Sequence, residues 1–139
     1  PLPNILTGYR HTAVYTPDGR LVIVFRDVSA EHNKLSEIAR DREITDLDNL
    51  ARKVNMGSPT EGDWVAWVGN YEDLVNGTEG DYRIRIKDNK HSWDCCYPGV
   101  EVLPDGTIVK TTYGHWEEEK PPYILSVRFT LDEIDRMVQ

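Results

Sequence analysis

The chain is short of positive charge and of long apolar runs, and each shortage excludes a class of partner. Its 139 residues carry 16 Lys and Arg against 24 Asp and Glu, a net charge of −8. A nucleic-acid backbone is bound by clustered positive charge, so we do not expect one as the partner. No apolar run approaches the roughly 18 residues that a membrane span needs, so we expect no membrane partner either.

Metal and cofactor chemistry also lack their usual sequence signals. The four histidines share no ligand spacing, and the chain has no phosphate-binding glycine loop and no Gly-x-Ser-x-Gly turn. The two cysteines are neighbours, Cys95 and Cys96. Adjacent residues of a strand face opposite ways, so this pair is predicted to be two free thiols and not a strained disulfide. We therefore expect no metal and no cofactor.

What the chain does contain is an internal repeat. Residues 9–22 align with residues 96–109, and a Pro-Asp-Gly turn falls at the same place in each copy. Alternating apolar residues flank both turns, which is the pattern of a tight β-hairpin. Arg10 aligns with Tyr97. If each hairpin is the inner edge of a propeller blade, these two side chains lie at the same height and face the same pocket.

Periodicity predicts an all-β fold of seven strands in two groups. The expected strands are 9–16, 20–26, 63–69 and 81–87 in the first group, and 97–103, 107–113 and 123–129 in the second. We interpret the groups as two four-stranded antiparallel blades over 8–88 and 94–130, the second without its fourth strand. A propeller needs at least four blades, so residues 1–139 are interpreted as a partial propeller, completed by the remaining blades or by self-association.

The other segments are assigned to helices and loops. Apolar residues at helical spacing predict a short helical insertion over 28–62, and acidic residues at 132 and 133 favour a terminal helix over 131–138. If the first strand of each blade runs away from the pocket, the Asp-Gly turns and the segment 70–80 lie at the far end. The insertion and the loops 88–96 and 114–122 then lie at the pocket end, where binding groups are expected.

The segment Asp94-Cys95-Cys96-Tyr97-Pro98-Gly99-Val100-Glu101-Val102-Leu103-Pro104-Asp105-Gly106-Thr107-Ile108 resembles sialidase-superfamily glycoside hydrolases. That family places its catalytic tyrosine at the start of an inner strand that ends in a Pro-Asp-Gly turn. The stretches 62–69 and 113–116 are similar to those of bacterial exo-sialidase-like proteins. The resemblance implies the last two blades of a six-bladed propeller, from a parent protein that is secreted or periplasmic.

The resemblance also implies roles for single residues. Tyr97 matches the nucleophile of a retaining mechanism, in which a phenol oxygen attacks the anomeric carbon of an acidic sugar. Arg10 matches one of three arginines that grip the sugar carboxylate. His115 lies in a Gly-His-Trp turn expected at the pocket end, where it would bind or stack on a sugar. The acid/base aspartate, the activating glutamate and the other two arginines have no match, so the chain alone is expected to be inactive.

Structural roles stay open beside these functional ones. Tyr97 is also compatible with an aromatic at the core edge, and Arg10 with a structural ion pair. Asp94 would either orient a neighbour of Tyr97 or simply form a turn. Three further arginines on predicted strands are expected to pair with carboxylates on a solvated surface; these are Arg26, Arg83 and Arg85.

The sequence therefore predicts part of a sialidase-like hydrolase that acts on terminal acidic sugars, the acidic glycan being its substrate. Two alternatives stay open. The first is a non-catalytic carbohydrate-binding propeller, in which the Arg and Tyr only line the pocket. The second is a polysaccharide lyase on the same scaffold, in which His115 or Tyr97 removes a proton next to a uronate carboxylate.

Overall fold

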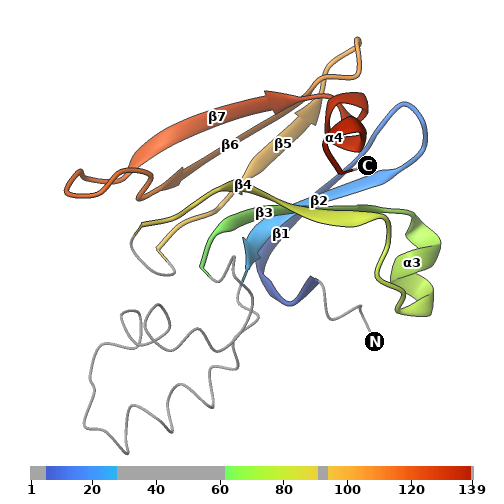
Figure 1. Cartoon of the computed structure of the whole chain (residues 1–139), viewed down its shortest axis with the longest axis horizontal. Coiled ribbons are helices and arrows are strands. Elements are labelled where there is room, and N and C mark those ends of the chain that lie inside the picture. Colours follow the sequence, from blue (N-terminus) through green and yellow to red (C-terminus); the bar gives the residue numbers. More distant parts are fainter. Residues whose placement is uncertain (1–5, 28–61, 91–93, 139) are drawn as a thin grey trace, which may run out of the picture.

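The computed structural model describes residues 6–27, 62–90 and 94–138, which form two antiparallel sheets and two helices (Figure 1). The first sheet has the order β1-β2-β3-β4, with β1 (Gly8–Tyr15), β2 (Leu21–Asp27), β3 (Trp64–Gly69) and β4 (Tyr82–Lys87). The second has the order β5-β6-β7, with β5 (Gly99–Val102), β6 (Ile108–Gly114) and β7 (Tyr123–Phe129). The helices are α3 (Tyr71–Asn76) and α4 (Leu131–Val138).

The predicted division into a four-stranded and a three-stranded antiparallel sheet is confirmed, as is the terminal helix. Each expected strand is present, with small shifts at its ends. The described sheets are open, and their assignment to a propeller stays a prediction. The predicted helices of the insertion lie outside the described residues, because only Gly62 of the segment 28–62 is described.

Helix α3 was not predicted, because its segment was expected to be a loop. It has only six residues, too few for a periodic apolar pattern to show. Its ends are instead marked by local polar contacts: the Asn70 N–H donates to the Asp73 carboxylate at 2.8 Å, and Gly77 ends the helix with a φ of 72°. The left-handed backbone at the end of a helix favours glycine.

The two sheets stack face to face with the main core between them (Figure 1). Strands β2 and β3 are buried on both faces and read as continuous apolar runs, which is why the first sheet is the centre of the fold. Strand β6 alternates buried and half-buried residues, so the second sheet is covered on one face only. The core between the sheets contains Val22, Val24, Ala66, Val68, Ile108, Phe129, Leu131 and Ile134.

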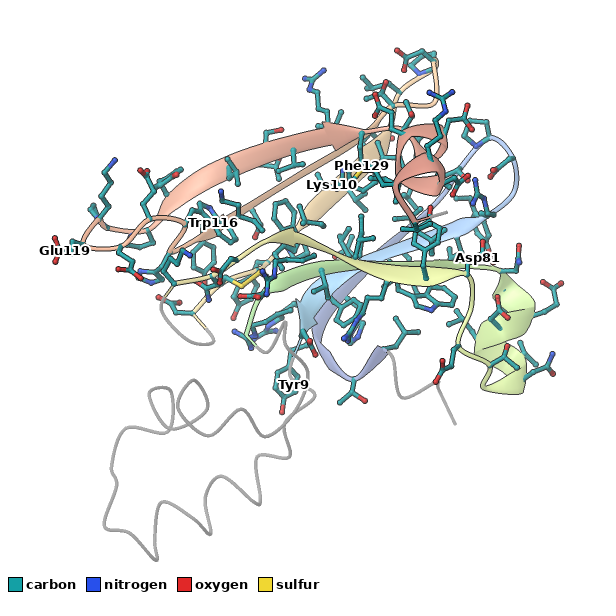
Figure 2. The ribbon with its side chains drawn as sticks, in the orientation of Figure 1. Tyr9, Asp81, Lys110, Trp116, Glu119 and Phe129 are labelled. Atoms are coloured by element: carbon teal, nitrogen blue, oxygen red, sulfur yellow. A yellow bond between two sulfur atoms is a disulfide. The ribbon has the colours of Figure 1, made fainter. Side chains whose placement is uncertain are left out.

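A lysine lies inside this core. Lys110 is fully buried on the inner face of β6, and its Nζ donates to the carbonyl oxygens of Ile108 and Val127 at 2.8 and 3.1 Å. The same nitrogen lies 3.2 Å from the ring centroid of Phe129, beside α4 (Figure 2). Burial lowers the pKa of the Lys110 amine to about 7, against a smaller opposing effect of Glu133.

The loops divide between the two ends of the sheets as predicted (Figure 1). The two Asp-Gly turns lie at one end with α3 and α4, and we call this the far end. The β4–β5 connection and the β6–β7 loop lie at the other end, which we call the site end. There Asn89 accepts a hydrogen bond from the His115 N–H at 3.1 Å, and the Lys90 N–H donates to the His115 carbonyl at 2.6 Å. These bonds join the two sheets at the site end.

Candidate functional site

Arg10 lies on β1 and Tyr97 lies two residues before β5, and the two side chains are in contact at the site end. The Arg10 Nη2 donates to the Tyr97 hydroxyl at 2.7 Å, and the guanidinium carbon lies 4.2 Å from the centroid of the Tyr97 ring. Strands β1 and β5 lie side by side here, and the Thr12 hydroxyl donates to the Pro98 carbonyl at 3.0 Å. Both side chains are exposed, Tyr97 by 59%. The predicted juxtaposition of Arg10 and Tyr97 on one face is confirmed.

Both members of this pair depend on unusual backbone conformations. Arg10 has a φ of 63° within an irregular part of the β1–β2 pairing, and Cys96, directly before Tyr97, has a φ of 77°. Elsewhere in the described ranges only Glu119 shares a positive φ without being glycine. Each such residue costs roughly 1–3 kcal/mol, and such costs concentrate at functional sites. The backbone therefore marks this pair as a candidate site independently of the side chains.

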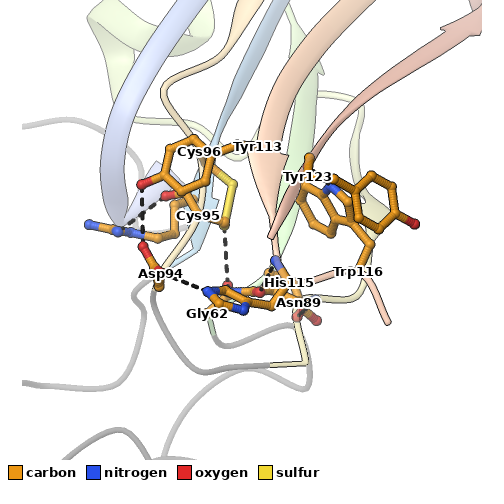
Figure 3. Close-up of a disulfide and its surroundings, with 11 residues drawn as sticks. Gly62, Asn89, Asp94, Cys95, Cys96, Tyr113, His115, Trp116 and Tyr123 are labelled. Carbon is orange, nitrogen blue, oxygen red and sulfur yellow. Dashed lines mark hydrogen bonds and ion pairs between the residues drawn. A yellow bond between two sulfur atoms is a disulfide. The ribbon is translucent and has the colours of Figure 1, made fainter. Parts of the chain in front are cut away.

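A chain of polar and aromatic contacts continues from Tyr97. Its ring stacks on Tyr113 with centroids 6.1 Å apart, and the Tyr113 hydroxyl donates to Asp94 Oδ1 at 3.3 Å. The other oxygen, Asp94 Oδ2, lies 2.6 Å from Nε2 of His115 (Figure 3). Burial and the neighbouring Asp94 raise the pKa of the Tyr113 phenol. We call Arg10, Asp94, Tyr97, Tyr113 and His115 the site cluster.

The site cluster contains the three predicted site residues, Arg10, Tyr97 and His115, together with Asp94 and Tyr113. Asp94 orients His115 and Tyr113, and Tyr113 in turn stacks on Tyr97. Tyr113 was not predicted as a site residue, although a signal existed. The hairpin register pairs Gly99 with Thr111, and two further residues along each strand bring Tyr97 opposite Tyr113.

The prediction of two free thiols was wrong, because Cys95 and Cys96 form a disulfide (Figure 3). The prediction assumed that the two residues lie in a strand and face opposite ways. They precede β5, and the left-handed backbone at Cys96 removes that alternation. Both cysteines are fully buried and pack against Trp64 and Trp116.

Arg83 and Arg85 pair with carboxylates as predicted, but those carboxylates are buried and do not lie on a solvated surface. Arg83 Nη1 lies 3.5 Å from Asp27 Oδ2, and Arg85 Nε lies 3.0 Å from Asp63 Oδ2. Asp63 also accepts a hydrogen bond from the Asn89 N–H at 2.8 Å. Burial raises the pKa of the Asp63 carboxyl to about 7, with a smaller contribution from neighbouring Asp88.

The third arginine, Arg26, contacts a backbone carbonyl and an aromatic ring, and its expected pairing with a carboxylate stays a prediction. Its Nη1 donates to the Cys95 carbonyl at 3.2 Å, and its guanidinium carbon lies 5.5 Å from the ring centroid of Tyr9. Arg26 therefore holds the backbone between Asp94 and Tyr97, two members of the site cluster. Tyr9 is half exposed at this end of β1 (Figure 2).

Three further observations concern metal ligands, membrane-spanning helices and surface hollows. Among the described residues, no three His, Cys, Asp or Glu side chains are placed to hold a metal. No helix in the described ranges is long and apolar enough to cross a membrane. A shallow hollow of about 230 Å³ lies at the far end, between the Asp-Gly turns and the start of α4, and is remote from the site cluster. Asp18, Asp105, Thr130 and Asp132 are among its lining residues.

No protein-family model matches the chain, and neither a curated protein nor a solved structure matches it. Any function must therefore be argued from the site cluster and from the resemblance of its sequence segments.

Proposed function

We propose that the chain forms two adjacent blades of a six-bladed propeller and contributes to a sialidase-like glycoside hydrolase site for terminal acidic sugars. One observation carries the proposal: a guanidinium on β1 and a phenol two residues before β5 meet at an exposed end. The four missing polar groups of such a site, an acid/base aspartate, an activating glutamate and two arginines, would come from other blades.

The charge environment of Arg10 supports the binding part of the proposal. Within the ranges that the structure describes, no carboxylate lies within ion-pair distance of its guanidinium, and Tyr97 is its polar partner. A guanidinium presents paired N–H donors that match a carboxylate in a bidentate geometry. Arg10 is thus a suitable binding group for the carboxylate of an acidic sugar.

Tyr97 supports the chemical part of the proposal. Its oxygen would form a bond to the anomeric carbon while the bond to the leaving sugar oxygen breaks and that oxygen takes a proton from an acid. The phenol proton would pass to a carboxylate base, and water would later release the sugar from Tyr97. A phenol suits this step because an ionised Asp or Glu would repel the carboxylate of the substrate. Asp94 already accepts contacts from Tyr113 and His115, so the base is expected from another blade.

The experiment measures turnover of an aryl sialoside by the assembly that carries the complete propeller. Tyr97→Phe is expected to lower kcat/KM by about 1,000-fold or more, because it removes only the attacking oxygen. Arg10→Ala is expected to raise KM more than it lowers kcat, because the carboxylate is bound in both ground and transition states. Tyr15→Phe is the matched control, since Tyr15 is equally exposed on β1 at the far end.

Each alternative outcome indicates a different function. Near-normal turnover in Tyr97→Phe contradicts the hydrolase. Binding of sialic acid without cleavage by the unmutated protein replaces it with a non-catalytic binding module. Release of an unsaturated uronate, detected by the absorbance of its conjugated double bond, replaces it with a lyase.

The propeller part of the proposal has its own test. Within the described part of the chain, the second sheet ends at β7, and no fourth strand pairs with its outer edge as β4 pairs with β3 in the first sheet. Exposed strand edges pair with other chains, and Ile124 adds an apolar side chain that is 74% exposed. We expect the 16.0 kDa chain alone to self-associate at micromolar concentration, and Ile124→Lys to weaken the association. A monomer in sedimentation velocity contradicts this expectation.

A further inference from the structure

We infer that the Cys95–Cys96 disulfide is a positioning element of the site cluster: it holds the backbone at Cys96 in the left-handed conformation that directs Tyr97 toward Arg10. The role in ligand binding rests on the proposed function. The role in placing the Tyr97 side chain does not, and the two are tested separately.

The position of the disulfide in the chain carries the inference. Only Cys95 and Cys96 separate Asp94 from Tyr97, and both of these neighbours belong to the site cluster. The backbone dihedral angles at the two cysteines therefore decide where Asp94 and Tyr97 point relative to each other. A disulfide between adjacent residues closes a small ring that includes the peptide bond between them, which restricts those angles.

The disulfide ring maintains a backbone conformation that is unfavourable for cysteine. Cys96 has a φ of 77°, in a region where a side chain normally clashes with the backbone. Glycine adopts this region readily, whereas cysteine remains there only when the surrounding structure constrains it. The disulfide provides such a constraint at the residue directly before Tyr97.

The surroundings hold the ring itself in place. Trp64 and Trp116, whose ring centroids are 5.9 Å apart, form one buried cluster with both cysteines. The Cys96 N–H donates to the Tyr113 carbonyl at 3.2 Å, which ties the segment to β6. Opening the disulfide is expected to let the backbone at Cys96 leave the left-handed conformation. The packing against the tryptophans and the hydrogen bond to Tyr113 are expected to remain. Tyr97 would then leave Arg10 while the rest of the sheet persists.

The experiment follows two tyrosines by fluorine NMR after labelling with 3-fluorotyrosine. Tyr97 reports on the site cluster, and Tyr82 reports on the far end, where its hydroxyl donates to Asp135 at 2.6 Å. Tyr→Phe variants assign the two signals. In Cys95→Ser/Cys96→Ser the Tyr97 signal is expected to move to its position in Arg10→Ala, while the Tyr82 signal stays. An unmoved Tyr97 signal overturns the inference.

A second double variant separates the backbone from the sulfur atoms. Cys95→Ser/Cys96→Gly has no disulfide, but glycine adopts the left-handed conformation without a steric penalty. We expect its Tyr97 signal to lie closer to that of the unmutated protein than the signal of Cys95→Ser/Cys96→Ser does. Equal displacement in both variants overturns the left-handed-backbone explanation and, with it, the inference.

If Cys95→Ser/Cys96→Ser does not fold, the unmutated chain is titrated with dithiothreitol. The reductant becomes a cyclic disulfide, and its two electrons and two protons convert the cysteine disulfide to two thiols. Movement of Tyr97 alone supports a positioning role. Movement of Tyr97 and Tyr82 together, or of neither, overturns it.

The ligand measurement is kept apart from these signals. Isothermal titration with N-acetylneuraminic acid is expected to show an affinity at least about fivefold lower in Cys95→Ser/Cys96→Ser than in the unmutated protein. If Tyr97 responds to the disulfide but no form of the protein binds the sugar, the positioning role stands and the proposed function fails. If the sugar binds every form equally, the role of the disulfide in ligand binding is refuted.

Discussion

Arg20 and Arg10 lie at opposite ends of the β1–β2 hairpin and have opposite environments. Arg20 is largely buried, and its guanidinium binds Asp135 of α4 through two hydrogen bonds of 3.0 and 2.8 Å. Its Nε also donates to Asp18 at 2.8 Å, and the pKa of Arg20 is raised, chiefly by Asp135. Arg10 is exposed and donates to a phenol.

The difference shows how the same residue type acquires different roles within one hairpin. The positive charge of Arg20 is neutralised by carboxylates of the chain, so it stabilises the attachment of α4 to the first sheet. The charge of Arg10 is left beside an aromatic ring at the surface, where an external anion can reach it. An arginine such as Arg10, with no carboxylate partner among the described residues, is available to bind an anionic ligand. An arginine with several carboxylate partners, such as Arg20, instead stabilises the fold.

The largest expected effect separates these roles by stability. Arg20→Ala is expected to lower the free energy of unfolding by about 2 kcal/mol, because it removes both guanidinium hydrogen bonds from the partly buried Asp135 and leaves that carboxylate only the Tyr82 hydroxyl. Arg10→Ala is expected to change it by less than about 0.5 kcal/mol, since Arg10 is exposed. Chemical denaturation followed by tryptophan fluorescence measures both. Equal losses in the two variants contradict the division of roles.

The two ends are also expected to respond to pH with opposite signs, and the larger response belongs to the site end. The pKa of Asp63 is raised by burial to about 7, so the folded chain keeps a proton that the unfolded chain releases near pH 4. The stabilisation from this proton is complete below about pH 4 and is lost as the pH rises through 7.

Asp63→Asn tests this response, because an amide does not titrate. We expect the unmutated chain to lose on the order of 1 kcal/mol more than the variant between pH 4.5 and 7.5 in urea denaturation. Parallel pH profiles for the two proteins would show that Asp63 is already ionised in the fold.

The smallest effect belongs to the far end. Hydrogen bonds from Thr16 and Arg20 lower the pKa of the Asp18 carboxyl to about 2. Its stabilisation is therefore present above about pH 4 and is lost as the pH falls through 2. Because Asp18 is half exposed, we expect only about 0.5 kcal/mol between pH 4.5 and 2.5. Asp18→Asn should reduce this loss.

Much of the fold could be predicted, because its signals are local. Alternation and the two Asp-Gly turns indicated all seven strands, and the repeat indicated that Arg10 and Tyr97 meet. Helix α3 could not be predicted from periodicity, since it depends on capping contacts at its two ends. One of the two roles considered for Asp94, orienting a neighbour of Tyr97, is present in its contact with Tyr113. The site role of Tyr113 and the pairing of Asp94 with His115 were not predicted, because the contact from Asp94 to His115 joins two loops.

The sequence by itself therefore determined the strands, the two Asp-Gly turns and the end of the molecule at which the described loops lie. These follow from side-chain alternation and turn chemistry, which act over a few residues. Only the tertiary structure decided which charges are neutralised and which sulfur atoms bond. Arg20 meets Asp135 across 115 residues of chain once the two sheets stack, and the same arrangement leaves Arg10 without a carboxylate partner among the described residues. Such pairings depend on where distant segments come to lie in space, and no local pattern encodes that.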